Sequence, residues 1–110
     1  MVAYVIARMT VHDPDKLREY AHLAAPHTER FGGRYLARGG ELTNLEGTTC
    51  EDRLVIAEFP DKATAVAMFS DPEYRKVAKL RKAAATTQLL TVIEGITYSD
   101  LPSAGVRKEH

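Results

Sequence analysis

The sequence lacks several features that would point to a particular class of protein. It has no tryptophan, a single cysteine, few aromatic residues and no excess of charge of either sign. Because Cys50 has no second cysteine to pair with, an internal disulfide is excluded, which favours a reducing, cytoplasmic setting. Fifteen basic side chains balance fifteen acidic ones, so no net field draws the chain to nucleic acid or to an anionic membrane.

Long hydrophobic runs are also missing, and no stretch is long enough to span a bilayer. The segment from Met1 to Ala7 lacks the basic start and apolar run of a signal peptide, and alternates like a β-strand instead. A chain of 110 residues is long enough for one domain with its own core. We expect this domain over residues 1–99 and a polar tail over residues 100–110.

Two glycine pairs, Gly32-Gly33 and Gly39-Gly40, bracket a short segment that carries two arginines and a tyrosine. Glycine adopts backbone angles that are closed to other residues, so each pair predicts a sharp change of chain direction. The first pair follows a helical pattern and is typical of a helix C-terminus. The segment between the pairs predicts a strand in which Arg34 and Arg38 share a face. We expect this corner to form the rim of a pocket.

Hydrophobic periodicity and cap signals predict four strands and three helices. Strands are expected where apolar residues alternate, and helices where apolar residues recur every three or four positions after an aspartate or proline start. The expected elements are a strand over 2–12, a helix over 13–31, strands over 34–42 and 53–59, helices over 62–69 and 73–85, and a strand over 88–98. Pro26 predicts either a kink in the first helix or a second helical piece from His27.

This order of elements is that of an α+β, ferredoxin-like (split βαβ) sandwich, with helices on one face of a four-stranded antiparallel sheet. The usual strand order of that fold, fourth, first, third, second, is assumed. The other face would then carry Tyr4, Ile6, Arg8, Leu54, Ile56, Glu58, Leu90, Val92, Glu94 and Ile96. This face is too apolar to leave in water, so we expect a homodimer that covers it, with Arg8 between Glu58 and Glu94. The alternative is an open sheet with solvated charges.

Several short motifs together resemble one family. They are the run from Gly32 to Gly40, Glu46-Gly47, Glu58-Phe59-Pro60, Ser70 to Tyr74, and Arg81. In combination they resemble the signature of the domain of unknown function 1330 family, over about residues 4–94. The resemblance implies a dimeric α/β barrel, in a superfamily that also holds small cofactor-free monooxygenases and stress-responsive proteins. It implies no catalytic assignment.

Arg81 is the most informative single residue. On the last predicted helix, Tyr74, Val77 and Ala84 belong to an apolar stripe, and Arg81 falls near its middle. A guanidinium that points into the core needs a carboxylate, carbonyl groups or an anionic ligand. The partner is either an internal acid such as Glu58 or a ligand.

Other residues extend the hypothetical pocket. Arg34 and Arg38, about 7 Å apart along one strand face, form with Arg81 a clamp for a carboxylate, or else are edge charges that discourage aggregation. His27 is either a proton-transfer group or an exposed residue. The histidines lack metal-ligand spacing and Cys50 lacks a basic neighbour, so we expect no metal, no cofactor and no cysteine nucleophile. The expected ligand-binding residues are Tyr20, His27, Arg34, Arg38, Tyr74 and Arg81.

Three functions follow from this pattern. The first is a homodimer that binds a small organic molecule, such as an organic acid, between helices and sheet. The second is a cofactor-independent enzyme in which an arginine stabilises an oxyanion, as the resemblance to the antibiotic-biosynthesis monooxygenases suggests. The third is a structural or stress-response dimer whose arginines only bridge internal acids. A bridge from Arg81 to Glu58 or another acid would favour the third.

Overall fold

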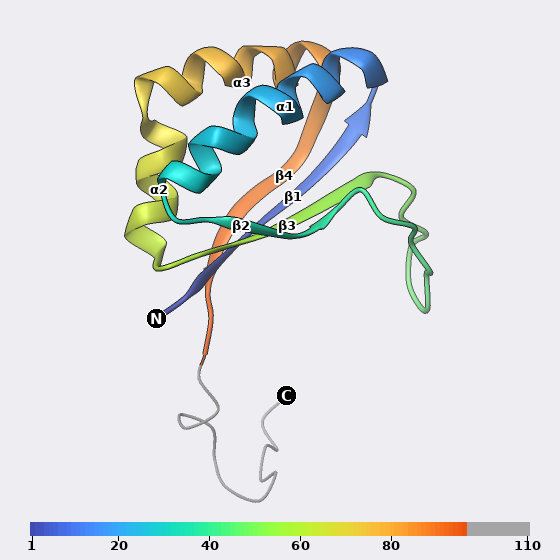
Figure 1. Cartoon of the computed structure of the whole chain (residues 1–110). Helices are drawn as coiled ribbons and strands as arrows, with labels where there is room; N and C mark the ends of the chain where they lie inside the picture. Colours follow the sequence, from blue (N-terminus) through green and yellow to red (C-terminus); the bar gives the residue numbers. More distant parts are fainter. Residues whose placement is uncertain (97–110) are drawn as a thin grey trace, which may run out of the picture.

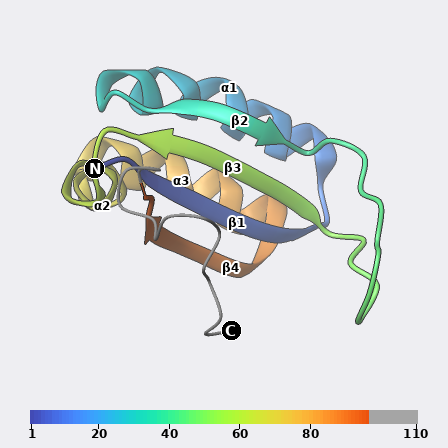
Figure 2. The ribbon, with the colours of Figure 1, turned by 90° about the horizontal axis from the view of Figure 1, so that it is seen from below.

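Three helices cover one face of a four-stranded antiparallel sheet in the computed structural model, which describes residues 1–96 (Figure 1). The elements are β1 (Ala3–Val11), α1 (Pro14–Arg30), β2 (Arg34–Arg38), β3 (Arg53–Phe59), α2 (Lys62–Ser70), α3 (Pro72–Ala84) and β4 (Ala85–Glu94). The strand order is β2-β3-β1-β4, and Figure 2 shows the uncovered face of the sheet with the helices behind it. The predicted ferredoxin-like fold and its strand order are confirmed. The expected tail over 100–110 lies outside the described residues.

Each helix begins after an aspartate, as the cap signals predicted. The carboxylates of Asp13, Asp61 and Asp71 each accept a hydrogen bond from a backbone N–H of the following first turn. These bonds satisfy N–H groups that have no partner within the helix. Pro14 and Pro72 follow two of these caps, at the position where a missing N–H costs nothing.

The first glycine pair ends α1. Gly32 has a φ of +78°, and the N–H groups of Gly32 and Gly33 donate to carbonyls of the last helical turn at 2.9 and 2.8 Å. This pair of bonds is the Schellman arrangement, in which a left-handed residue satisfies the loose carbonyls of a helix end. Upstream, α1 continues through Pro26, so the alternative of a second helix from His27 is wrong.

β2 and β4 differ most from their predicted bounds, whereas β1 differs by one residue at each end. β2 ends at Arg38 rather than at residue 42, because Gly39 has a φ of +73° and turns the chain away from the sheet. β4 begins at Ala85, directly after α3, rather than at residue 88.

The helix-covered face of the sheet is built from small and apolar side chains. On the central strand β1, Ala3, Val5, Ala7 and Met9 are at most 7% exposed, as the alternation predicted. The residues between them are half-buried or exposed. The small alanine side chains let α1 and α3 lie close to the sheet, where they bury the main hydrophobic clusters.

A register shift in β2 separates the two arginines that were expected to share a face. The shift falls after Tyr35. Arg34 lies opposite Glu58, on the uncovered face, and Arg38 lies opposite Val55, on the helix-covered face. The prediction of a shared face is wrong, because an extra residue in a strand reverses the alternation beyond it.

β4 carries a second irregularity, with a similar consequence. Counting in steps of two from the buried Ala85 would put Leu90 and Val92 on the uncovered face, as we expected. A register shift relative to β1 instead places them opposite Ala7 and Val5, on the helix-covered face. The prediction for β4 was therefore wrong. The uncovered face of β4 carries Leu89, Thr91 and Ile93.

The ion pairs of the uncovered face also differ from the expected ones. Arg8 lies opposite Leu54 rather than beside Glu58, and its Nε donates to Asp52 at 2.7 Å. Glu58 accepts a hydrogen bond from Arg34 Nε at 2.8 Å. The expected position of Arg8 between Glu58 and Glu94 is wrong, because the register offsets these residues along the strands.

Gly33 provides a stability prediction. A Cβ at Gly33 would lie 2.7 Å from the Phe59 ring and 2.9 Å from the Thr28 methyl group, both buried. We expect Gly33→Ala to lower the free energy of unfolding by about 1–3 kcal/mol through overpacking. Thermal melts should show a fall of roughly 4–8 °C per kcal/mol. Gly40→Ala is the matched control, since a Cβ at Gly40 meets nothing within 4 Å. Equal midpoints for both variants would contradict the packing role of Gly33.

Candidate functional site

A cavity of about 60 Å³ lies between the helices and the covered face of the sheet. Most of its wall is apolar, and its polar lining residues are Tyr20, Thr28, Tyr35, Arg38, Arg53 and Arg81. Three of these are arginines, whereas none of the described residues that line the cavity is acidic. The wall therefore carries an excess of positive charge.

Arg81 projects into this space from the last turn of α3. It is only 6% exposed and lies on the buried face of the helix, together with Tyr74 and Ala78. Its Nη1 donates to the Thr87 hydroxyl at 2.7 Å, and its guanidinium carbon lies 5.9 Å from the centre of the Tyr20 ring. Its Nε has no hydrogen-bond acceptor among the described residues. Such a buried, unpaired donor costs about 1–3 kcal/mol.

Glu58, the internal acid considered as a salt-bridge partner of Arg81, does not pair with it. Within residues 1–96, Arg81 forms no salt bridge. Glu58 pairs with Arg34 instead, on the uncovered face of the sheet. The alternative of a bridge between Arg81 and Glu58 is therefore wrong.

Hydroxyl groups supply the polar contacts of the cavity wall. Tyr20 and Tyr74 share a hydrogen bond between their hydroxyls at 2.6 Å, and their rings meet edge to face with centres 6.5 Å apart. Thr28 and Tyr35 share a second one at 3.0 Å. Burial raises the pKa of the Tyr20 phenol well above its usual value; Tyr74 adds to the rise, and the charge of Arg81 opposes it. Tyr20 is therefore a neutral phenol over the physiological range.

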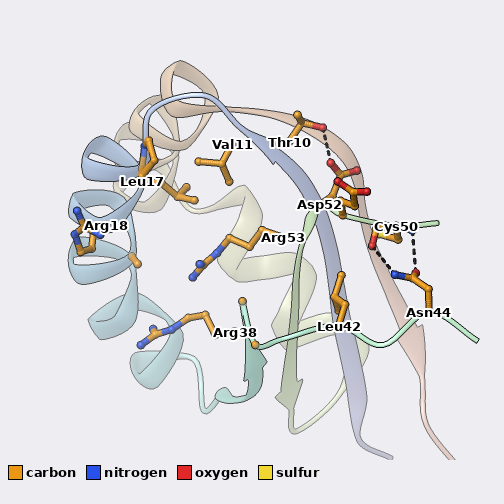
Figure 3. A pocket seen from close by; sticks show the side chains of 15 residues that line it. Thr10, Val11, Leu17, Arg18, Arg38, Leu42, Asn44, Cys50, Asp52 and Arg53 are labelled. Atoms are coloured by element: carbon orange, nitrogen blue, oxygen red, sulfur yellow. Dashed lines mark hydrogen bonds between the residues drawn. The ribbon is translucent and has the colours of Figure 1, made fainter.

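Arg38 and Arg53 lie where the cavity meets an open groove. This groove, of about 710 Å³, runs between α1 and the segment of residues 39–53. Both side chains line cavity and groove alike, and Figure 3 shows them extending from the sheet toward α1. Burial, and secondarily the neighbouring charge of Arg38, lowers the pKa of Arg53. The Arg38 guanidinium lies 4.6 Å from the centre of the Tyr35 ring, a cation–π contact.

The cavity brings together three of the predicted ligand-binding residues, Tyr20, Arg38 and Arg81. Tyr74 touches this group through the Tyr20 hydroxyl. His27 packs edge-on against the Tyr74 ring, with ring centres 6.2 Å apart, and does not line the cavity. Arg34 lies on the other face of the sheet, so the predicted clamp of three arginines does not form.

Sequence reasoning missed three polar residues of the wall, Thr28, Tyr35 and Arg53. A signal for Arg53 was present, because it precedes Val55 by two positions and the alternation of β3 puts both on one face. Thr28 recurs at helical spacing with Leu17 and Ala24, which indicates a buried side chain but no polar role. Tyr35 follows Arg34 directly, so strand alternation puts it on the opposite, helix-covered face.

Neither a cluster of metal-ligating side chains nor a membrane-spanning helix occurs in the described part of the chain. Residues 1–96 contain no group of three or more His, Cys, Asp or Glu side chains that could hold a metal ion. None of the described helices is both long and apolar enough to cross a bilayer.

The buried phenol of Tyr20 generates a pH prediction. Since its pKa is raised in the folded state, the phenol contributes stability that is fully present below about pH 10, the ordinary tyrosine pKa. This stability is lost as the pH rises further, because the unfolded chain releases the proton first, by up to about 1.4 kcal/mol per pH unit. We expect Tyr20→Phe to unfold with a shallower alkaline loss of stability than the wild type, measured by denaturant titration between pH 9 and 11. Parallel curves for the two proteins would show that Tyr20 is not responsible.

Comparisons with known proteins agree with this architecture. No curated protein matches the sequence. A protein of unknown function from Rhodopseudomonas palustris is 24% identical, with a TM-score of 0.65 over 87% of this chain and 83% of that chain. SnoaB, a cofactor-independent oxygenase from Streptomyces nogalater, is 16% identical, with a TM-score of 0.64 over 87% and 94%. A dimeric ferredoxin-like protein of unknown function from Thermobifida fusca is 18% identical, with a TM-score of 0.60 over 86% and 91%.

At these identities the solved structures show a shared fold and nothing about activity. The family comparison is more specific. A family model described as "Domain of unknown function (DUF1330)" matches residues 2–96, which span all the motifs that carried the sequence resemblance. The chain therefore belongs to the DUF1330 family and has its place among the ferredoxin-like α+β proteins.

Proposed function

We propose that the protein binds a small organic acid in the cavity between the helices and the sheet. The observation that carries this proposal is the buried guanidinium of Arg81. It faces a cavity whose described wall residues include two further arginines and no acid. Its Nε lacks an acceptor among the described residues.

The electrostatic argument rests on what Arg81 contacts. Thr87 and Tyr20 offer a neutral hydroxyl and a ring face, which satisfy part of its hydrogen-bonding capacity but do not neutralise its charge. Taking a charge out of water costs several kcal/mol unless an opposite charge compensates it. A ligand carboxylate would accept from Nε and supply that opposite charge at the same time.

The remaining wall limits the rest of the ligand. Val5, Ala7, Val55 and Ala57 are among the apolar side chains on the sheet side of the cavity. A volume of about 60 Å³ suits a short aliphatic acid rather than a large aromatic one. The hydroxyl of Tyr20, kept neutral by burial, is able to donate to a carboxylate oxygen.

Arg81→Met tests the ligand role directly. Methionine keeps a similar apolar stem, and no acid among the described residues loses a partner, so we expect the thermal midpoint to be retained. Binding of short carboxylic acids such as acetate, propionate and butyrate should weaken roughly ten- to a hundredfold, as expected for a lost charged hydrogen bond. Isothermal titration calorimetry measures both the wild type and the variant.

Arg75→Met is the matched control, because Arg75 is an exposed arginine on the same helix. It removes one positive charge without touching the cavity and should leave acid binding unchanged. A wild type that binds none of the acids, together with an Arg81→Met variant whose midpoint falls sharply, would identify Arg81 as purely architectural.

We also propose that the uncovered face of the sheet pairs with a second copy of this chain. This face carries Tyr4, Ile6, Leu54, Ile56, Leu89 and Ile93, of which Leu89 is 46% and Ile93 54% exposed. A contiguous apolar surface of this kind is typical of an interface. The dimeric state named for the Thermobifida fusca protein of the same fold supports this choice of partner.

Ile56→Asp tests the dimer. Ile56 lies opposite Ile6 on the central strand, so an aspartate there would be buried without a partner in a dimer but partly hydrated in a monomer. We expect the wild type to sediment as a dimer at micromolar concentration and Ile56→Asp as a monomer. Leu45→Asp, at a position 87% exposed in a loop, should remain dimeric. A wild type that sediments as a monomer would overturn the proposal.

A further inference from the structure

Arg38 and Arg53 form a second group of positive charge, at the mouth of the cavity. They extend from neighbouring strands toward α1 (Figure 3) and line both the cavity and the open groove of about 710 Å³. A ligand that reaches from the cavity into the groove would pass both guanidinium groups.

The acids around this mouth are engaged elsewhere or lie at its rim. Asp52 accepts hydrogen bonds from Arg8 at 2.7 Å and Thr10 at 2.9 Å, on the uncovered side of the sheet. Asp15 pairs with Arg18 on α1, and Glu51 is exposed at the groove. Within residues 1–96, neither Arg38 nor Arg53 forms a salt bridge.

The chain holds these two arginines in place with specific contacts. Gly39 has a φ of +73° and passes so close to Arg53 that a Cβ there would overlap its guanidinium. The ring of Tyr35 lies under the Arg38 guanidinium at 4.6 Å, and the Tyr35 hydroxyl is tied to Thr28. Gly39, the first residue of the second glycine pair, thus leaves the space that the Arg53 guanidinium occupies.

The sheet register sets the distance between the two positive ends of the cavity. Met9 on β1 lies opposite Arg53 on one side and Thr87 on the other, and Arg81 donates to Thr87. Arg53 and Thr87 are therefore two strand spacings apart, roughly 10 Å between Cα atoms. Because Arg53 and Arg81 line the same cavity, a short molecule could contact the two guanidinium groups together.

We propose that Arg38 and Arg53 are a second anion subsite, so that the ligand is a short linear dicarboxylate. One carboxylate occupies the cavity at Arg81, and the other lies at the mouth between Arg38 and Arg53. This assignment rests on the proposed function, because it takes the Arg81 cavity as the first subsite. Paired arginines suit this role because a guanidinium fork binds a carboxylate through two parallel hydrogen bonds.

The test compares diacids with monoacids of equal chain length. Succinate, glutarate and adipate are titrated calorimetrically against butyrate, valerate and hexanoate, at neutral pH and constant ionic strength. In the wild type, we expect the best diacid to bind roughly tenfold or more tightly than its matched monoacid. Arg53→Met should reduce this ratio to about two or less, because the diacid loses much more affinity than its matched monoacid.

Two further variants keep the test decisive. Arg38→Met should also lower the ratio of diacid to monoacid affinity. Because Arg38 is exposed, this variant tests the second subsite even if Arg53→Met does not fold. Arg34→Met, on the same strand but the opposite face, removes the same charge and should keep the wild-type ratio.

The outcomes separate this inference from the function on which it rests. If monoacids bind but diacids bind no better, the second subsite is overturned and the Arg81 site stands. If Arg38→Met or Arg53→Met weakens the binding of monoacids and diacids by the same factor, these arginines contribute only a nonspecific positive potential. That result also overturns the second subsite. If no acid of either kind binds, the proposed function fails, and the inference fails with it.

Discussion

The register of the sheet is the constraint on which the whole interior depends. A shift after Tyr35 turns Arg38 inward while Arg34 stays on the uncovered face. A second shift, between β1 and β4, sets Thr87 opposite Met9 on the covered face, where Arg81 reaches it. Irregularities of this kind re-aim side chains, because one extra residue moves all that follow to the other face. The inward face of Arg38 and the contact of Arg81 with Thr87 follow from these two shifts.

Charge is distributed unequally between the two faces of the sheet. On the uncovered face, Arg8 pairs with Asp52 and Arg34 with Glu58, so each cation there has an acid beside it. On the covered face, Arg38 and Arg81 contact aromatic rings, and Arg81 also donates to a hydroxyl. Such neutral groups orient a guanidinium without cancelling its charge. The chain as a whole is electrically balanced, and the local imbalance inside the fold supports the proposal of an anionic ligand.

The glycine-bracketed segment links the end of α1 to this interior. Gly32 closes the helix, and Gly33 lets the chain pass the buried ring of Phe59. Gly39 then turns the chain beside Arg53, where a larger residue would collide with the guanidinium. Gly32 and Gly33 therefore have structural roles, and Gly39 lies beside a charged group at the cavity mouth.

The sequence by itself determined the fold class, the order of the elements, the aspartate caps and the burial of Arg81, because each depends on local periodicity or on residues close in the chain. It did not determine the face of Arg38 or the side chains that β4 turns inward. Those depend on two register shifts between strands far apart in the sequence. Only the tertiary structure decided them, because alternation within one strand carries no information about where its partner inserts or skips a residue.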